Sequence, residues 1–238
     1  MDQKRGKMRR KPAEMGSRKM VVYDQERWDL LKRLQDRAKR VMMSLDDANI
    51  ESIVHGSVAR GDVSASSDID IFVPQVVRSF RMEIALNPNV MLQRKIVQAT
   101  PRHLPKAHIL LGENTTVTFP LITPLRRETE FYRFGGYLGL GEIDSRAAGV
   151  DKRLMLIEPV PEGHVETPLS ELSLGHVAKA IGVCQDTVEE RIRVLRRRAL
   201  SGRTGVYLEY VLGEDQSFEK VLSEIASRDP AIRRRVIG

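Results

Sequence analysis

The residue types best able to do chemistry gather in one short part of the chain. Gly56 and Ser57 follow a short apolar stretch, and Asp68 and Asp70, two positions apart, open a second one. Side chains in a strand alternate between its two faces, so both aspartates would project from the same side. Paired carboxylates attract a divalent cation, and a turn with exposed backbone N–H groups can bind phosphate. This part of the chain therefore predicts a site for a metal ion and a phosphorylated ligand.

A simpler interpretation of the two acids stays open. Asp68 and Asp70 would then lie on the solvated face of an edge strand behind a glycine turn. That interpretation accounts for the carboxylates, but it gives no reason for the Gly-Ser pair that precedes them.

The segment resembles the signature of the nucleotidyltransferase superfamily related to DNA polymerase beta. The signature is an apolar residue, Gly-Ser or Gly-Gly, a spacer, and then Asp-apolar-Asp-apolar. Gly56-Ser57 and Asp68-Ile69-Asp70-Ile71 match it. The additional Ala59-Arg60-Gly61 and Ser67 are most similar to the minimal and CCA-adding branches found in prokaryotes. The close match covers residues 50–73 only.

The resemblance implies a role for each of these residues. Asp68 and Asp70 would hold one or two Mg²⁺ ions that bridge the phosphates of a nucleoside triphosphate such as ATP. The amides of Gly56 and Ser57, with the Ser57 hydroxyl, would bind the terminal phosphates, and Arg60 would add a charge-assisted contact. Ser67 would orient Asp68 by hydrogen bonding. An ion pair between Arg60 and a nearby aspartate, Asp62 or Asp68, is the alternative for the arginine.

Full members of the superfamily carry a third carboxylate on a later strand, where it helps to activate the attacking hydroxyl. This sequence departs from that pattern, because the corresponding strand offers Thr116 and Thr118. We expect a further strand over residues 126–134 with Glu128 and Glu130 on one face, and Glu130 is our candidate third catalytic acid. A site with only two acids would bind nucleotide and turn over poorly.

The elements that must position these residues follow from hydrophobic periodicity and turn residues. Asp24 caps a predicted helix that runs to about Ala48 and packs on the sheet. The other predicted elements are a strand over 52–55, the Asp-bearing strand ending at Pro74, a helix over 90–98, a hairpin of 108–111 with 117–122, a strand over 154–158 and a linker over 163–168.

The C-terminal part has the spacing of a helix, a turn and a helix over residues 174–200, followed by a β-type segment over 206–212. This resembles a winged helix-turn-helix domain, whose second helix often enters a DNA groove. Acidic residues near the start of that helix would repel phosphates, so a winged helix used for protein contact is the alternative. The candidate nucleic-acid contacts are Arg193, Arg196, Arg197 and Arg203.

Composition places limits on the class of protein. The 238 residues carry a formal net charge of +7 and are 41% hydrophobic, which is ordinary for a globular chain. Residues 1–20 hold eight basic and two acidic side chains and predict a disordered tail that either touches polyanions or only aids solubility. No run approaches the ~18 apolar residues of a membrane span. With the single Cys184, these features predict a cytoplasmic protein without an internal disulfide.

Together these features predict an α+β protein with a mixed sheet and helices on one face, followed by a small winged-helix domain. The expected divisions are a tail over 1–20, a nucleotidyltransferase domain over 21–162 and the winged-helix domain over 168–238. The expected function is metal-dependent transfer of a nucleoside monophosphate from a nucleoside triphosphate to a hydroxyl. The alternative is a DNA-binding regulator whose degenerate domain senses nucleotides without catalysis.

Overall fold

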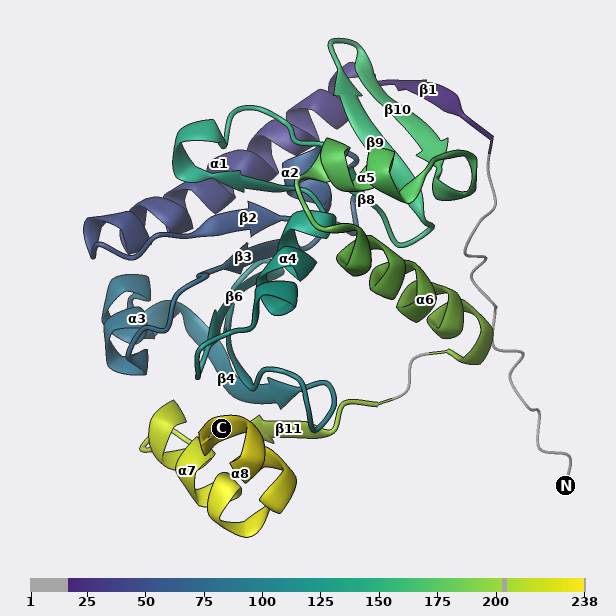
Figure 1. The fold of residues 1–238 in the computed structure, drawn as a ribbon. Helices are drawn as coiled ribbons and strands as arrows, with labels where there is room; N and C mark the ends of the chain where they lie inside the picture. Colours follow the sequence, from purple (N-terminus) through teal and green to yellow (C-terminus); the bar gives the residue numbers. More distant parts are fainter. Residues whose placement is uncertain (1–16, 203–204, 238) are drawn as a thin grey trace, which may run out of the picture.

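A computed structural model describes residues 17–202 and 205–237 (Figure 1). The described chain forms two β-sheets with helices packed on them. The larger sheet has seven strands in the order β11-β4-β5-β6-β3-β2-β7, and the smaller has four in the order β1-β10-β9-β8.

The seven-stranded sheet is mixed, as the sequence predicts. Strands β3 and β6 run parallel, and the other neighbouring pairs are antiparallel. The β5–β6 pair is the expected hairpin, which is thereby confirmed. The strands of this sheet are β2 (Ile53–His55), β3 (Ile69–Phe72), β4 (Met91–Gln98), β5 (Lys106–Leu111), β6 (Thr115–Pro120), β7 (Tyr137–Gly139) and β11 (Leu208–Val211).

One face of this sheet carries the main hydrophobic core. Helix α1 (Gln25–Asp47) starts at the expected Asp24 cap, whose side chain accepts a hydrogen bond from the Arg27 amide. It shares the core with α3 (Ser79–Leu86), α7 (Phe218–Arg228) and α8 (Pro230–Ile237). The short 3₁₀ helices of the chain are η1 (Pro88–Val90), η2 (Leu140–Glu142) and η3 (Leu169–Glu171).

The opposite face of the sheet is covered in part by α4 (Arg126–Phe134). The ring of Tyr132 stacks on Phe72 with centroids 3.5 Å apart and meets the His55 ring edge-on at 4.8 Å. Phe72 and His55 point away from the main core because their strand neighbours Ile71 and Val54 point into it. Helices therefore lie on both faces, and the prediction that they cover one face is wrong.

The four-stranded sheet contains β1 (Lys19–Val22), β8 (Gly149–Val150), β9 (Met155–Val160) and β10 (Gly163–Pro168). Next to it, α5 (Leu174–Ile181) and α6 (Gln185–Ser201) bury Val177 and Val188 against Leu154 and Leu156. The expected linker over 163–168 is thus wrong, because β10 pairs with β1 on one side and β9 on the other. The expected domain boundary at residue 162 falls inside the β9–β10 hairpin.

Two predicted elements have the wrong secondary structure. Residues 91–98 form strand β4 rather than a helix, because β5 and β11 pair with both of its edges and override local preference. Residues 126–134 form helix α4 rather than a strand. Glu128 accepts a hydrogen bond from the Leu125 amide at 2.8 Å and caps its first turn.

The expected wing is an edge strand of the seven-stranded sheet. Strand β11 pairs with β4, and beyond it Phe218 meets Phe119 of β6 with ring centroids 5.5 Å apart. The separate winged-helix domain over 168–238 is therefore not confirmed. The predicted tail lies mostly outside the described residues, except that Lys19 and Met20 belong to β1. None of the described helices has the length and apolar character needed to cross a membrane.

Candidate active site

The backbone at Gly56 turns sharply where β2 ends. Gly56 has φ +83° and ψ −145°, which side-chain-bearing residues rarely adopt, although the space around its Cα is open. Its N–H donates to the Gly136 carbonyl at 3.0 Å, so this amide, expected to bind phosphate, is already used within the protein. Ser57 then starts the four-residue helix α2 (Ser57–Arg60), and amides in a first turn have no partner inside the helix.

Strand pairing brings the Gly-Ser pair and the two aspartates together. His55 lies opposite Asp70 in the antiparallel β2–β3 pair, so the end of β2 meets the start of β3. The Ser57 hydroxyl donates to Ser67 Oγ at 3.2 Å, and the same Ser67 oxygen accepts from the Ser64 amide at 3.0 Å. Ser67 thus fixes the loop around Ser57, whereas the sequence predicts that it orients Asp68.

The two carboxylates are not committed to the protein's own structure. Asp68 is exposed and Asp70 is half-buried, and neither side chain has a hydrogen bond or ion pair within the described residues. Burial raises the pKa of Asp70, and the charges of Lys152 and then Lys106 partly offset this effect. No group of three or more metal-binding His, Cys, Asp or Glu side chains occurs in the described part of the chain.

Arg60 is held inside the loop. Its side chain is 8% exposed, Nη1 donates to the Gly135 carbonyl at 2.5 Å, and Nη2 donates to Asp62 at 3.0 Å. A methyl group on Gly136 would clash with the arginine at 2.7 Å. The ion-pair alternative is therefore the arrangement in the structure, in which Arg60 holds the loop through Asp62 and Gly135.

The strand next to Asp70 is β6, as expected, and it carries threonines there. Thr116 lies opposite Asp70 in the parallel register, and Thr118 lies 3.2 Å from His108 Nδ1. On the next strand, Lys106 donates to the Tyr132 hydroxyl at 3.2 Å, and burial is the main cause that lowers its pKa to about 8. His108 and Lys106 were not predicted as site residues, although their alternate positions on one strand are a usable signal.

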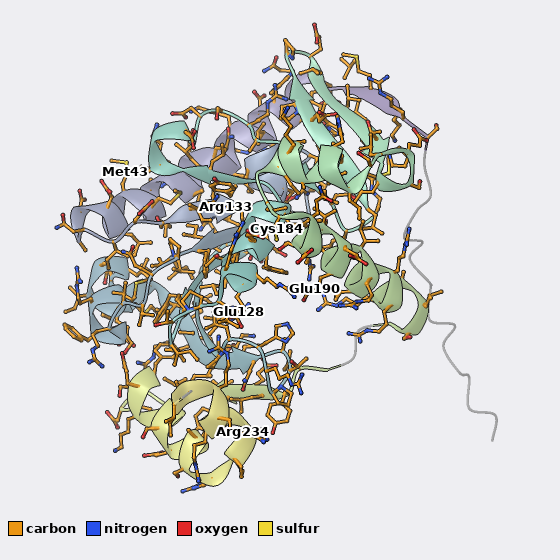
Figure 2. All side chains as sticks on the ribbon, viewed as in Figure 1. Met43, Glu128, Arg133, Cys184, Glu190 and Arg234 are labelled. Atoms are coloured by element: carbon orange, nitrogen blue, oxygen red, sulfur yellow. The ribbon has the colours of Figure 1, made fainter. Side chains whose placement is uncertain are left out.

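Glu130 lies at the junction between α4 and α6. Its carboxylate accepts hydrogen bonds from Thr187 Oγ1 at 2.5 Å, Cys184 Sγ at 3.0 Å and Arg126 Nε at 2.7 Å. Cys184 lies beside α4 in Figure 2. Burial raises the pKa of Glu130, but the hydrogen bonds outweigh it and lower the pKa to about 2.

Glu128 is likewise bound elsewhere. It accepts from the Leu104 amide and pairs with Arg235, both at 2.7 Å. Glu130 and Glu128 therefore join elements of the fold, and the strand that was expected to bring Glu130 to the site is absent.

The predicted nucleic-acid residues lie along α6. Arg193, Arg196 and Arg197 are exposed there, and Arg203 is outside the described residues. Figure 1 shows α6 running away from α4 toward the residues that precede β11. At the start of α6, Asp186 and Glu190 pair with Arg127 of α4 at 3.5 and 3.7 Å.

Comparison with known proteins supports the resemblance over part of the chain. The model of the nucleotidyltransferase domain family matches residues 30–106, which run from α1 to the first residue of β5 and include Gly56, Ser57, Asp68 and Asp70. No curated protein and no solved structure matches the chain. The match supports a place in the polymerase beta-like superfamily and a general nucleotidyl transfer function.

Proposed function

We propose that this protein is a metal-dependent nucleotidyltransferase. It transfers a nucleoside monophosphate from a nucleoside triphosphate such as ATP to a hydroxyl acceptor. The observation that carries the proposal is that Asp68 and Asp70 lie beside Ser57 without a hydrogen bond or ion pair among the described residues. Leaving a half-buried carboxylate unpaired costs free energy, and a bound cation removes that cost.

The donor set fits Mg²⁺. This ion is usually held by one or two carboxylates together with substrate phosphates, and the site offers two carboxylates on a surface that a phosphate can reach. Asp68 and Asp70 would hold the metal, which neutralises charge on the transferred phosphoryl group and the leaving pyrophosphate when bound.

The chain's own residues bind and orient the substrate. The Ser57 hydroxyl and the first amides of α2 bind the terminal phosphates, while Arg60 and the Gly135-Gly136 segment keep that loop in place. Thr116, next to Asp70, cannot take a proton from the acceptor as a carboxylate would. We therefore expect slow turnover. Glu130 is bound by Thr187, Cys184 and Arg126, so we assign it a structural role.

The experiment uses triphosphates labelled at the α-phosphate. The protein is incubated with each of the four labelled ribonucleoside triphosphates, Mg²⁺ and fractionated cell lysate. We expect label in one macromolecular or small-molecule fraction, abolished by EDTA and by Asp68→Asn. Unchanged labelling with Asp68→Asn and Asp70→Asn would exclude this site as the catalytic one.

A DNA-binding regulator that senses nucleotides is the second candidate function, favoured by the threonines at the third-acid position. It predicts tight triphosphate binding without release of pyrophosphate.

Both candidates allow nucleic acid to bind α6 through Arg193, Arg196 and Arg197, with Arg203 beyond them. Such binding falls as salt rises, because neutralised phosphates release counterions. A DNA and RNA titration of the full chain at two salt concentrations, repeated with Arg193→Ala, tests it.

A further inference from the structure

Two basic side chains from distant parts of the sequence lie against the same aromatic ring. The guanidinium carbon of Arg191 on α6 is 4.5 Å from the centroid of the Phe131 ring on α4. The ammonium nitrogen of Lys106 on β5 is 5.6 Å from the same centroid and 5.5 Å from that of Tyr132. Phe131 is 36% exposed, so the junction of β5, α4 and α6 brings two positive charges to a ring that solvent can reach.

Neither charge has an acidic partner among the described residues. Lys106 and Arg191 are both half-buried, and neither forms an ion pair in the part of the chain that the structure describes. Lys106 donates a hydrogen bond to the Tyr132 hydroxyl, but burial raises the pKa of Tyr132, so this group stays neutral. The Nε atom of Arg191 is buried and has no hydrogen-bond partner within the described residues.

The acids around this pair of cations are bonded to other groups. Glu128 acts on the pKa of Lys106 against the effect of burial, but it is already bonded to Arg235 at 2.7 Å and to two backbone amides. Glu190, next to the arginine in sequence, pairs with Arg127 of α4 at 3.7 Å. Neither carboxylate is therefore free to balance the two cations.

Half-buried cations without a counterion cost free energy. Burial lowers the pKa of Lys106 to about 8 and that of Arg191 to about 10. A neighbouring positive charge acts in the same direction in each case, Arg191 on Lys106 and Arg198 on Arg191. Attraction to the face of Phe131 offsets part of the cost, and a bound anion would remove more of it.

A phosphate group suits this pair of cations better than a carboxylate does. A phosphate monoester carries about 1.5–2 negative charges at pH 7, whereas a carboxylate carries one. A guanidinium binds phosphate through two parallel hydrogen bonds, and an ammonium binds it as a point charge.

We propose that Lys106 and Arg191 form an anion site that binds one phosphate group of a ligand. The site is separate from the position expected for terminal phosphates at Ser57. Ser57 follows β2 on one side of the Asp70 strand, and Lys106 belongs to β5 on the other side. The site does not depend on the proposed function.

The test compares two aldehydes that form imines with lysine in the full chain, pyridoxal 5′-phosphate and pyridoxal, which lacks the phosphate. Borohydride reduction and mass spectrometry of peptides measure the rate of labelling at Lys106. Each rate is divided by the rate at Lys220, an exposed lysine of α7, which corrects for the different reactivity of the aldehydes. Pyridoxal 5′-phosphate should then label Lys106 about tenfold or more faster than pyridoxal, and inorganic phosphate should slow this labelling.

Substitution of Arg191 separates a phosphate site from a lysine that is merely reactive. Arg191→Gln removes the charge and should abolish the preference for pyridoxal 5′-phosphate, whereas Arg191→Lys should keep most of it. Arg33→Gln, at an exposed position of α1, is the matched control and should be labelled as the unaltered protein is. Thermal unfolding checks that each variant is folded.

Three outcomes would overturn the proposal. They are equal corrected labelling of Lys106 by the two aldehydes, no labelling by either, and a preference that persists in folded Arg191→Gln. The first two are measured on the unaltered protein, so they decide the matter even if a variant does not fold.

Two further arms identify the source of the phosphate group. Protection of Lys106 by ATP with Mg²⁺ that is lost in Asp70→Asn assigns the group to the nucleotide of the proposed function. Protection by inorganic phosphate alone that persists in Asp70→Asn assigns it to a separate ligand.

Discussion

At the scale of single residues, Asp70 differs in what it contacts from the other described aspartates that are at least partly buried. Asp62, Asp151 and Asp144 form ion pairs, whereas Asp68 and Asp70 form none among the described residues. Residues retained for stability are normally satisfied by their surroundings. Because Asp70 is half-buried and has no partner among the described residues, it marks its pair with Asp68 as a candidate ligand site.

The first prediction concerns Asp70→Asn. Burial raises the pKa of this carboxyl above its unfolded value, so its charge costs stability at neutral pH, and the cost disappears as the pH falls below the unfolded pKa. The neutral asparagine should therefore leave the Tm at pH 7 equal or higher while abolishing metal-dependent transfer. Thermal unfolding and the labelling assay measure both effects.

The matched control for this prediction is Asp62→Asn. It leaves the buried Arg60 without its ion pair and should lower the Tm. A Tm loss in Asp70→Asn as large as that in Asp62→Asn would make Asp70 a structural residue.

A second prediction separates Arg60 from Ser57. Arg60→Ala should lower the free energy of unfolding by about 3 kcal/mol, because it leaves Asp62 buried without a partner. Ser57→Ala should cost about 1 kcal/mol or less, since it loses one hydrogen bond to Ser67, yet it should weaken triphosphate binding. Urea unfolding and a triphosphate titration test the pair.

Arg33→Ala, at an exposed position of α1, is the reference for an arginine without such contacts. If Arg60→Ala unfolds at the same urea concentration as Arg33→Ala, the ion pair contributes nothing to stability. Arg60 would then return as a candidate phosphate ligand.

At the scale of elements, Glu130 joins two helices that are far apart in sequence. Its folded pKa of about 2 lies below the unfolded value, so the stability it contributes is present above about pH 4.5 and is lost as the pH falls toward 2. Glu130→Gln should therefore lower stability at pH 7 by about 2 kcal/mol and flatten the pH dependence between 5 and 3.

Chemical denaturation across that pH range, with Glu189→Gln as an exposed control on α6, checks this prediction. A wild-type unfolding curve for Glu130→Gln, combined with a strongly reduced transfer rate, would restore Glu130 as the third catalytic acid.

The local signals in the sequence were sufficient for some elements only. The Asp24 cap and the helical spacing predict α1, and the Gly-containing loop at Gly112 predicts the β5–β6 hairpin. For α4, nine residues are too few to distinguish the helical period of about 3.6 residues from the strand period of 2. Glu128 and Glu130, two positions apart, fit a strand as well as a helix. The strand β4 and the linker-like β10 depend on partners distant in the sequence.

The sequence likewise predicts the part of the site that is local in the chain and misses the contacts that are distant. The motif predicts that Gly56-Ser57 lies beside Asp68 and Asp70, because all four belong to two consecutive strands and their ends. The sequence allows either Asp62 or Asp68 as the ion-pair partner of Arg60. In the structure the partner is Asp62, and Gly135 and Gly136, which are distant in sequence, pack around the arginine.

At the scale of the whole molecule, the C-terminal residues complete the main sheet and core. Phe218 is fully buried against Phe119, so Phe218→Ala should lower the free energy of unfolding by about 3–5 kcal/mol. Leu200→Ala, at a position 72% exposed on α6, should change it by less than about 0.5 kcal/mol. Urea unfolding followed by circular dichroism compares the two.

For the same reason, a fragment of residues 168–238 should not fold alone, since β11, α7 and α8 would lose the surfaces that they cover. A cooperative thermal transition of that fragment would contradict this view and support an independent C-terminal domain.

The pairing of β1 with β10 also has a consequence for how the chain is made. Lys19 lies opposite Glu166, so β1 finds its partner only after nearly 150 more residues have been added. At typical synthesis rates of about 5–20 residues per second, that interval is roughly seven to thirty seconds. Closing so large a loop also carries an entropic cost before any contact repays it. On the ribosome, β1 cannot pair with β10 until β10 emerges, and until then it must be kept from pairing with other nascent chains.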